Sequence, residues 1–234
     1  MRTKGEKGTT MCMRVQYLGV ALLAMCGLAC VSAGMASAKT THDFEAEVPK
    51  ETPYILTGTA PGGEIVWKWT SGASMACAAS GLNGTIKESP LQKLELEPTY
   101  ENCTLGGLPA TVDTNCKNLF TGETNASGHG IVHVVCPSEL PVKVTVNGCT
   151  IEVGPQTAEQ GAHYTSTGSG SSRDVDFNVT MTKASNKLVG AACSLIAGLA
   201  GELSIVGNYT VKAYADEGGA EGKQIGFWTK ATIF

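Results

Sequence analysis

Two histidines four residues apart are the first side chains that could do metal chemistry. His129 and His133 lie among β-branched residues, and glycines flank the first of them. On a strand this spacing places both side chains on one face, about 13 Å apart at ~3.3 Å per residue, which is too far for a shared metal ion. We expect both on the solvent side of a strand, and we assign no metal ligand and no cofactor.

Hydroxyl and carboxylate clusters are the next candidates for chemistry. Residues 165–174 are rich in serine and threonine, but they contain no G-x-S-x-G turn, and nothing fixes a histidine or aspartate beside a serine. Residues 216–222 supply three carboxylates without the alternating ligand spacing of a calcium loop. We expect a long polar hairpin loop and a solvated turn, and we assign no catalytic residue.

Aromatic side chains could bind a sugar. Trp67 and Trp69 share one face of an alternating stretch, residues 64–70, and could form a stacking platform. The chain has only three Trp, six Tyr and five Phe, and an aromatic pair on the apolar face of a strand is more often part of the core. Both interpretations stay open. Tyr164 and Arg173, at the two ends of the polar loop, are the other candidate binding residues.

Strands must position these side chains. Alternation of apolar and polar residues is typical of a strand with one buried face, and turns rich in Gly, Asn, Ser and Pro separate the alternating stretches. The clearest stretches are residues 93–97, 129–136, 142–146, 175–182, 203–213 and 224–233. Only residues 188–201 could form a short helix. The sequence therefore predicts an all-β chain, folded as an antiparallel β-sandwich or barrel-like fold.

The first 38 residues have the three-part build of an export signal. Basic residues precede an uncharged apolar run, residues 15–31, and Ala36 and Ala38 fit a cleavage site. A run of about seventeen residues is marginal for a ~30 Å hydrocarbon core, so a transmembrane anchor is the weaker alternative. A lipoprotein signal at Cys30 is another. The predicted parts are a cleaved signal helix (1–38), an extended leader (39–62) and a β-sandwich-like domain (63–234).

Cleavage would leave an acidic chain. The whole sequence has 17 basic and 21 acidic residues, and the signal contains four basic residues and one acidic residue. The mature chain would therefore keep 13 basic and 20 acidic residues, which gives a net charge of −7. Such a chain, without a basic cluster, is not expected to bind nucleic acid or anionic lipid. We expect a secreted or cell-surface protein with no membrane attachment after cleavage, and the sequence leaves its oligomeric state open.

Six cysteines follow the signal, which points to three disulfides. Zinc is the competing interpretation, but no close C-x2-C pair is present. Two segments of similar build follow each other over residues 100–153, each with twelve residues between its cysteines, a Leu-Pro and a β-branched run. We interpret them as two cystine-closed hairpins. This predicts bridges from Cys103 to Cys116 and from Cys136 to Cys149, and by elimination from Cys77 to Cys193.

The second hairpin needs a change of register. Every second residue is apolar from Val142 to Val146 and again from Cys149 to Val153, but the two sets have opposite parity and both should point inward. We expect a β-bulge at Asn147-Gly148, where glycine freely adopts a positive φ. A two-residue Asn-Gly turn that ends the strand is the alternative.

Several runs of the chain resemble one group of exported proteins. They are residues 100–104, residues 109–112, the strand 128–137, the corner 146–151 and the loop 164–173. Over residues 75–230 they look like uncharacterised secreted, disulfide-containing β proteins of actinobacterial soil bacteria. The chain departs from that group at residues 188–203, where an alanine-rich apolar stretch replaces an expected polar hairpin. The resemblance implies export and a β-rich disulfide fold, and it implies no substrate.

Two classes of function remain. The favoured one is a non-catalytic secreted or cell-surface protein that binds a wall polymer, a glycan or another protein through loops on a rigid scaffold. The alternative is a secreted hydrolase whose site is assembled from residues distant in sequence.

Export signal cleavage gives a direct test. The small residues at Ala36 and Ala38 predict processing after Ala38, so sequencing of the exported protein should begin at Lys39. A mature chain that begins at a lipid-modified Cys30 would contradict the prediction.

Overall fold

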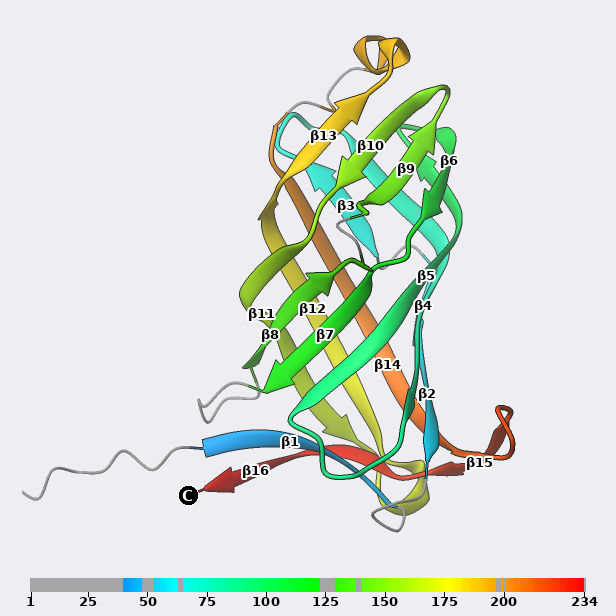
Figure 1. Ribbon diagram of the computed structural model, residues 1–234, viewed down its shortest axis with the longest axis vertical. Coiled ribbons are helices and arrows are strands. Elements are labelled where there is room, and N and C mark those ends of the chain that lie inside the picture. The colour runs from blue at the N-terminus through cyan, green and yellow to red at the C-terminus, as the bar shows by residue number, and fades with distance from the viewer. Residues whose placement is uncertain are drawn as a thin grey trace, which may run out of the picture. The chain divides into compact units, whose positions relative to one another are not determined.

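The computed structural model describes residues 40–47, 53–62, 65–122, 129–137, 140–196, 199 and 201–233, all within the unit Ala38–Phe234. These residues form antiparallel strands and two short 3-10 helices (Figure 1). None of the described helices is long and apolar enough to cross a membrane. The predicted export signal lies outside the described residues, so its cleavage stays a prediction.

The elements follow in chain order. They are β1 (Thr40–Ala46), β2 (Tyr54–Ala60), β3 (Val66–Trp69), β4 (Ser74–Ile86), β5 (Lys93–Leu105), β6 (Leu108–Asp113), β7 (Lys117–Gly122), β8 (His129–Val135), β9 (Val142–Val146), β10 (Cys149–Val153), β11 (Gln156–Thr167), η2 (Gly170–Ser172), β12 (Asp174–Ala184), β13 (Asn186–Val189), η3 (Ala191–Leu195), β14 (Leu203–Asp216), β15 (Glu221–Ile225) and β16 (Phe227–Ile233). The predicted all-β, antiparallel, disulfide-linked fold is confirmed.

Eight strands close into a ring of ladders. In ring order they are β2, β4, β5, β7, β8, β11, β12 and β14, and β14 pairs back with β2. Closure leaves no unpaired edge in the ring. A second layer continues from one end of it: β3 pairs with both β4 and β14, while β6, β9, β10 and β13 extend in turn from β5 (Figure 1).

The strands β4 and β5 serve both layers because each changes its inward face part-way along. On β4 the buried positions are Met75 and Cys77 and then Ser80 and Leu82, so their parity changes once. The ladder with β5 skips one residue pair at this place, and Asn102 on β5 has a positive φ of 49°. The irregularity lets one continuous pair of strands line two successive parts of the interior.

Aromatic side chains fill the ring at the end away from the second layer. Phe44, Phe120, Tyr164 and Phe177 pack with ring centroids 4.9 to 6.5 Å apart. Phe44 comes from β1, which pairs with β16 and runs across this end of the ring (Figure 1). Its backbone also exchanges two hydrogen bonds with Leu91, of 2.7 and 2.9 Å. The predicted extended leader is therefore wrong for residues 40–46, which are a core strand.

The predicted cysteine pairing is wrong for all three bridges. The disulfides join Cys77 to Cys103, Cys116 to Cys136, and Cys149 to Cys193. Ladder register explains the first two. Cys77 and Cys103 are direct partners between β4 and β5, and Cys116 and Cys136 come one step beyond the last pair of β7 and β8. The third bridge ties β10 to η3.

The predicted bulge at Asn147-Gly148 is also wrong, and the alternative turn is correct. Asn147 and Gly148 have positive φ values of 45° and 79°, and Val146 pairs directly with Cys149. A two-residue turn reverses the chain, so residues of opposite parity on β9 and β10 share the buried face. Residues 188–201, which could have formed a short helix, contain instead the end of β13 and the 3-10 helix η3. The polar loop expected at residues 165–174 is shorter than predicted, because β11 continues to Thr167 and β12 begins at Asp174. The turn expected at residues 216–222 is also shorter, because β14 ends at Asp216 and β15 begins at Glu221.

Removal of single disulfides tests this covalent framework. In the chain-entropy model, the bridge across 44 residues (Cys149 and Cys193) contributes about 4 kcal/mol and the bridge across 20 residues (Cys116 and Cys136) about 3 kcal/mol. Urea unfolding of the two double Cys→Ala variants should therefore show the larger loss for Cys149 and Cys193. Equal losses, or a larger loss for the shorter bridge, would contradict the prediction.

Candidate functional site

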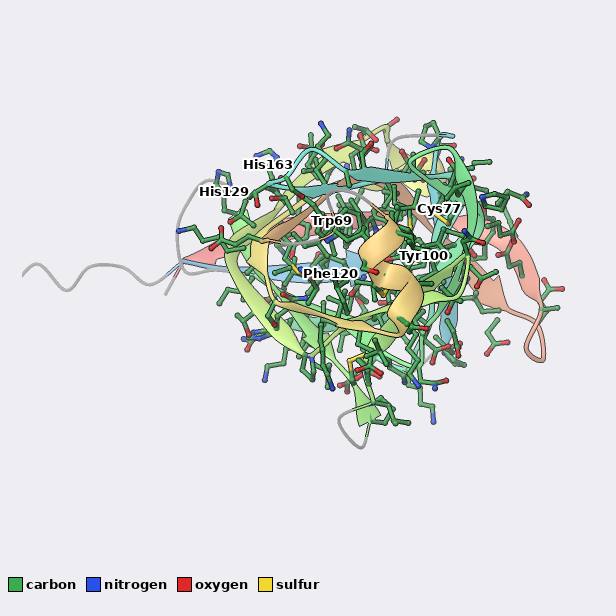
Figure 2. All side chains as sticks on the ribbon, turned by 90° about the horizontal axis from the view of Figure 1, so that it is seen from above. Trp69, Cys77, Tyr100, Phe120, His129 and His163 are labelled. Carbon is green, nitrogen blue, oxygen red and sulfur yellow. A yellow bond between two sulfur atoms is a disulfide. The ribbon has the colours of Figure 1, made fainter. Side chains whose placement is uncertain are left out.

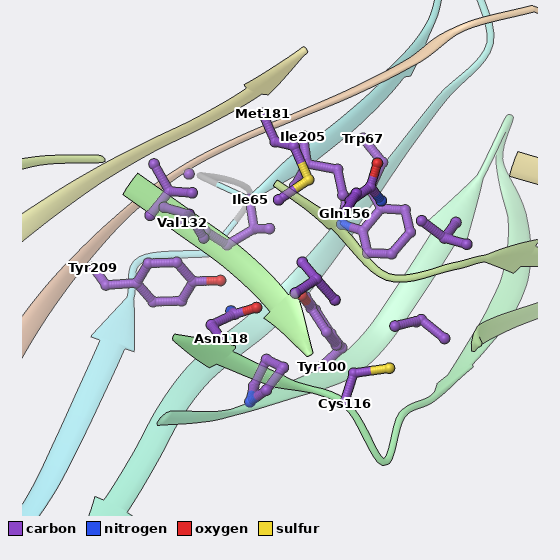
Figure 3. Close-up of a pocket in the computed structure, with 16 residues that line it drawn as sticks. Ile65, Trp67, Tyr100, Cys116, Asn118, Val132, Gln156, Met181, Ile205 and Tyr209 are labelled. Carbon is purple, nitrogen blue, oxygen red and sulfur yellow. The ribbon is translucent and has the colours of Figure 1, made fainter. Parts of the chain in front are cut away.

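An interior cavity lies where the ring meets the second layer (Figure 3). Its volume is about 40 Å³. Since one water needs roughly 10–15 Å³ of such space, the cavity has room for a few non-hydrogen atoms. The lining side chains come from strands of both layers: Ile65, Trp67, Pro98, Tyr100, Cys116, Asn118, Val132, Val134, Val142, Val153, Gln156, Val179, Met181, Ile205, Gly207 and Tyr209.

Small inward residues leave this space open. Val179 follows Phe177 along β12, and Val132 is opposite Phe120 in the ladder of β7 and β8. Both valines line the cavity and are too small to fill the ring. Gly207 stands on β14 at the same level. A Cβ atom there would lie 2.1 Å from Cδ1 of Ile65, so glycine is required for Ile65 to reach the wall.

Two hydrogen-bond donors in the lining have no partner. Trp67 is 1% exposed, and its indole Nε1 is buried without an acceptor. The side chain of Gln156 is half-buried, but its Nε2 is buried and equally unpartnered. In the view of Figure 3 these two side chains lie on the same side of the cavity. Most buried polar groups in proteins are hydrogen-bonded, so two such donors around one cavity need an explanation.

Two tyrosines supply the other polar atoms of note. Tyr100 packs edge-on against Trp67, with ring centroids 5.8 Å apart. Burial raises the pKa of Tyr100 to about 12, and the neighbouring Tyr209 hydroxyl opposes that rise. Burial also raises the pKa of Tyr209, with Tyr100 adding to the effect. Both hydroxyls are therefore protonated at neutral pH. Among the described lining residues none is acidic, basic or histidine.

Two surface grooves adjoin the cavity on either side of the disulfide between Cys116 and Cys136. The first groove shares Pro98 and Cys116 with the cavity, and it is lined by Glu97, Pro98, Thr99, Thr114, Asn115, Cys116, Pro137 and Leu140. The second groove shares Val134 and Gln156 with the cavity, and it is lined by His133, Val134, Val135, Cys136, Pro155, Gln156 and Thr157. Each groove therefore lies directly beside the cavity and shares two of its wall residues.

The structure places the four predicted binding residues mostly in the core. Trp67 and Trp69 are 1% and 3% exposed, so they form no sugar-stacking platform, and the core interpretation is confirmed. Tyr164 is buried in the aromatic cluster and does not lie in a loop. Only Arg173 lies at the surface, where its guanidinium carbon is 5.0 Å from the ring centroid of Trp228. Of the four, the structure brings Trp67 alone to the cavity.

The histidines lie outside the cavity lining. His129 pairs in register with His163 of β11, and their ring centroids are 4.8 Å apart at the surface (Figure 2). The Nδ1 atom of His133 instead lies 2.9 Å from the hydroxyl oxygen of Thr157. In the part of the chain that the structure describes, no three His, Cys, Asp or Glu side chains are grouped to hold a metal ion.

Sequence reasoning missed the polar residues of the cavity. Asn118 has the same strand parity as buried Phe120, and Tyr209 the same parity as buried Val211. A polar residue at an inward position of an alternating strand was the available signal. The sequence matches no protein-family model and no curated protein, and the structure matches no solved structure.

Alkaline titration tests the environment of the cavity tyrosines. A phenol whose pKa is raised in the folded state, as for Tyr100 from 10.0 to about 12, contributes stability that is fully present below pH 10 and is lost as the pH rises through 12. Replacement of Tyr100 by Phe should reduce the fall in unfolding free energy over this window, measured by denaturant unfolding. An equal fall in the Tyr100→Phe variant would contradict the assignment.

Proposed function

We propose that the protein is an exported, non-catalytic binding protein, built on a barrel-like ring of strands, that holds a small group of its ligand in the interior cavity. The observation that carries the proposal is an apolar cavity lined by two buried N–H donors, on Trp67 and Gln156, that have no acceptor. Ligand sites typically combine apolar walls with a few convergent polar groups.

The lining supports binding more than catalysis. General acid–base and nucleophilic catalysis need groups whose protonation or nucleophilicity is matched to the reaction. The described lining offers two tyrosines with raised pKa values, two amides and an indole. These groups orient a ligand by hydrogen bonds and leave its bonds intact.

The grooves suit a larger, polar ligand body. The first groove combines threonine, asparagine and glutamate side chains with two prolines and a leucine. Hydroxyl-rich polymers such as a wall polymer or a glycan offer the hydrogen-bonding partners for such a surface. We therefore propose the same class of partner as before, a wall polymer or a glycan, and we place its binding site at the cavity and its grooves, not at the surface loops.

A hydrolase has less support. Asp174 and Asp176 are a carboxylate pair on one face of β12. Burial raises the pKa of Asp174, and Asp176 adds to the rise, whereas Lys212 and the hydrogen bond from Gln224 oppose it. Asp174 accepts a 2.9 Å hydrogen bond from Gln224, and Asp176 accepts a 2.8 Å bond from Thr210. Neither lines the cavity or its two grooves.

A cavity-filling variant tests the proposal. Val134 lies where the cavity meets the second groove, so Val134→Trp should block the cavity from this side. Purified mature protein should bind to at least one cell-wall fraction or arrayed glycan, and the variant should bind it at least tenfold more weakly. Ile131→Trp is the matched control, since Ile131 is on the same strand but has the opposite parity.

Both variants must first show the circular dichroism spectrum of the parent. Binding that survives Val134→Trp, or that falls equally in Ile131→Trp, would refute the cavity site. Turnover of a polysaccharide, peptide or ester that depends on a single Asp, Glu or His would refute the non-catalytic function.

A further inference from the structure

We infer that the group held in the interior cavity is a short, neutral acyl group, such as acetyl, whose carbonyl oxygen accepts hydrogen bonds from Trp67 and Gln156. This inference rests on the proposed binding function and adds the chemistry of the bound group. Three features of the lining lead to it: the sense of its hydrogen bonds, its lack of charge and its size.

The hydrogen-bond sense requires an acceptor. An indole N–H can only donate, and the amide nitrogen of Gln156 is a donor as well. Both nitrogens are buried without a partner, and both side chains border the same cavity. One carbonyl oxygen has two lone pairs and can accept from both donors at once. An ammonium group or a second N–H donor in this position would leave both nitrogens unpartnered.

The lack of charge excludes an ionised acceptor. No cationic side chain is among the described lining residues, and a carboxylate or phosphate oxygen buried here would have no counter-charge. The acceptor must therefore be neutral. A ketone, ester or amide carbonyl meets this condition.

The size limits the rest of the group. About 40 Å³ leaves room for a few non-hydrogen atoms, so one or two carbons can accompany the carbonyl. Val132, Val179 and Met181 supply an apolar wall for such carbons. The remainder of the ligand must lie outside, in one of the grooves.

The first groove favours a glycan as the carrier of the acyl group. Its Thr99, Thr114 and Asn115 side chains can both donate and accept hydrogen bonds, as sugar hydroxyls do. Pro98 and Cys116 line both the groove and the cavity, so a ligand in the groove lies next to the cavity. An N-acetylated sugar would place its acetyl group inward and its ring in the groove.

A pair of isosteric probes tests the acceptor. Acetone and isobutene have the same shape, and only acetone carries an oxygen. The chain has three tryptophans that report separately by NMR: Trp67 at the cavity, buried Trp69 outside its lining, and Trp228, which donates a 3.0 Å hydrogen bond to Glu45. Saturating acetone should move the indole N–H signal of Trp67 downfield, and isobutene should not. The other two indole signals should stay in place with both probes.

Matched variants separate the hydrogen bond from the fold. Gln156→Leu replaces the amide with a slightly shorter apolar side chain and removes one donor, so acetone should bind about fivefold more weakly, while isobutene should bind at least as well. Gln224→Leu is the control, because Gln224 donates to Asp174 away from the cavity. Among glycans, N-acetylglucosamine oligomers should bind, and glucosamine oligomers should bind at least tenfold more weakly.

Each outcome distinguishes the two proposals. If neither acetone nor isobutene enters, the cavity as a ligand site fails. If both enter with equal affinity and Gln156→Leu weakens both alike, the cavity stands and the acyl inference is overturned. A long-lived water at the Trp67 N–H that acetone does not displace also overturns the inference. Binding of acetylated peptides in preference to acetylated glycans would overturn the glycan as carrier.

Discussion

The ladder between β2 and β14 is the contact on which the rest of the structure depends. It pairs the first and last strands of the ring, from Tyr54 opposite Ala215 to Thr59 opposite Thr210. Every other ladder of the ring joins two of the eight strands that follow each other along the chain. Without this ladder β2 and β14 would present unpaired edges to each other, and β14 would be connected to β4 only through the short strand β3. Closure also fixes which side chains share the interior, so the aromatic cluster and the cavity are consequences of one long-range pairing.

The interior of the ring is filled unevenly, and the cavity follows from this distribution. At one end Phe44 of β1 packs onto the aromatic side chains of the ring, and it stacks on Phe177 and on Phe227 of β16, with ring centroids 5.9 and 6.2 Å away. Further along, valines and Gly207 face the same space. An eight-stranded ring is just wide enough for large side chains to fill, so valine and glycine at one level leave a void. Beyond the cavity, the interior of the second layer is closed by the strands of that layer and by the disulfide from Cys149 to Cys193.

Local patterns in the sequence predict the strands well and their partners poorly. β9 matches its predicted residues because Val-Lys-Val-Thr-Val alternates without interruption. β1 was missed because its seven residues contain only one large apolar side chain, Phe44, and show no alternation. Its partner β16 also lies at the other end of the chain. The cysteine pairs failed for a related reason. Equal spacing suggested local bridges, whereas ladder register brings Cys77 beside Cys103. Gln156 has the parity of buried Ala158 and Tyr164, but the first half of β11 lacks the large apolar residues that would have marked this face as inward.

An unpartnered indole alone is weak evidence for a ligand, as Trp69 demonstrates. Its Nε1 is also buried without an acceptor, yet Trp69 is absent from the cavity lining. What distinguishes Trp67 is a second unpartnered donor, Gln156, at the same space. Each unsatisfied buried group costs about 1–3 kcal/mol, which is a large share of a net stability of roughly 5–15 kcal/mol. A leucine in place of Gln156 would avoid one of these costs. A ligand that binds only the folded chain and supplies the missing acceptor recovers them, so the polar lining couples stability to occupancy.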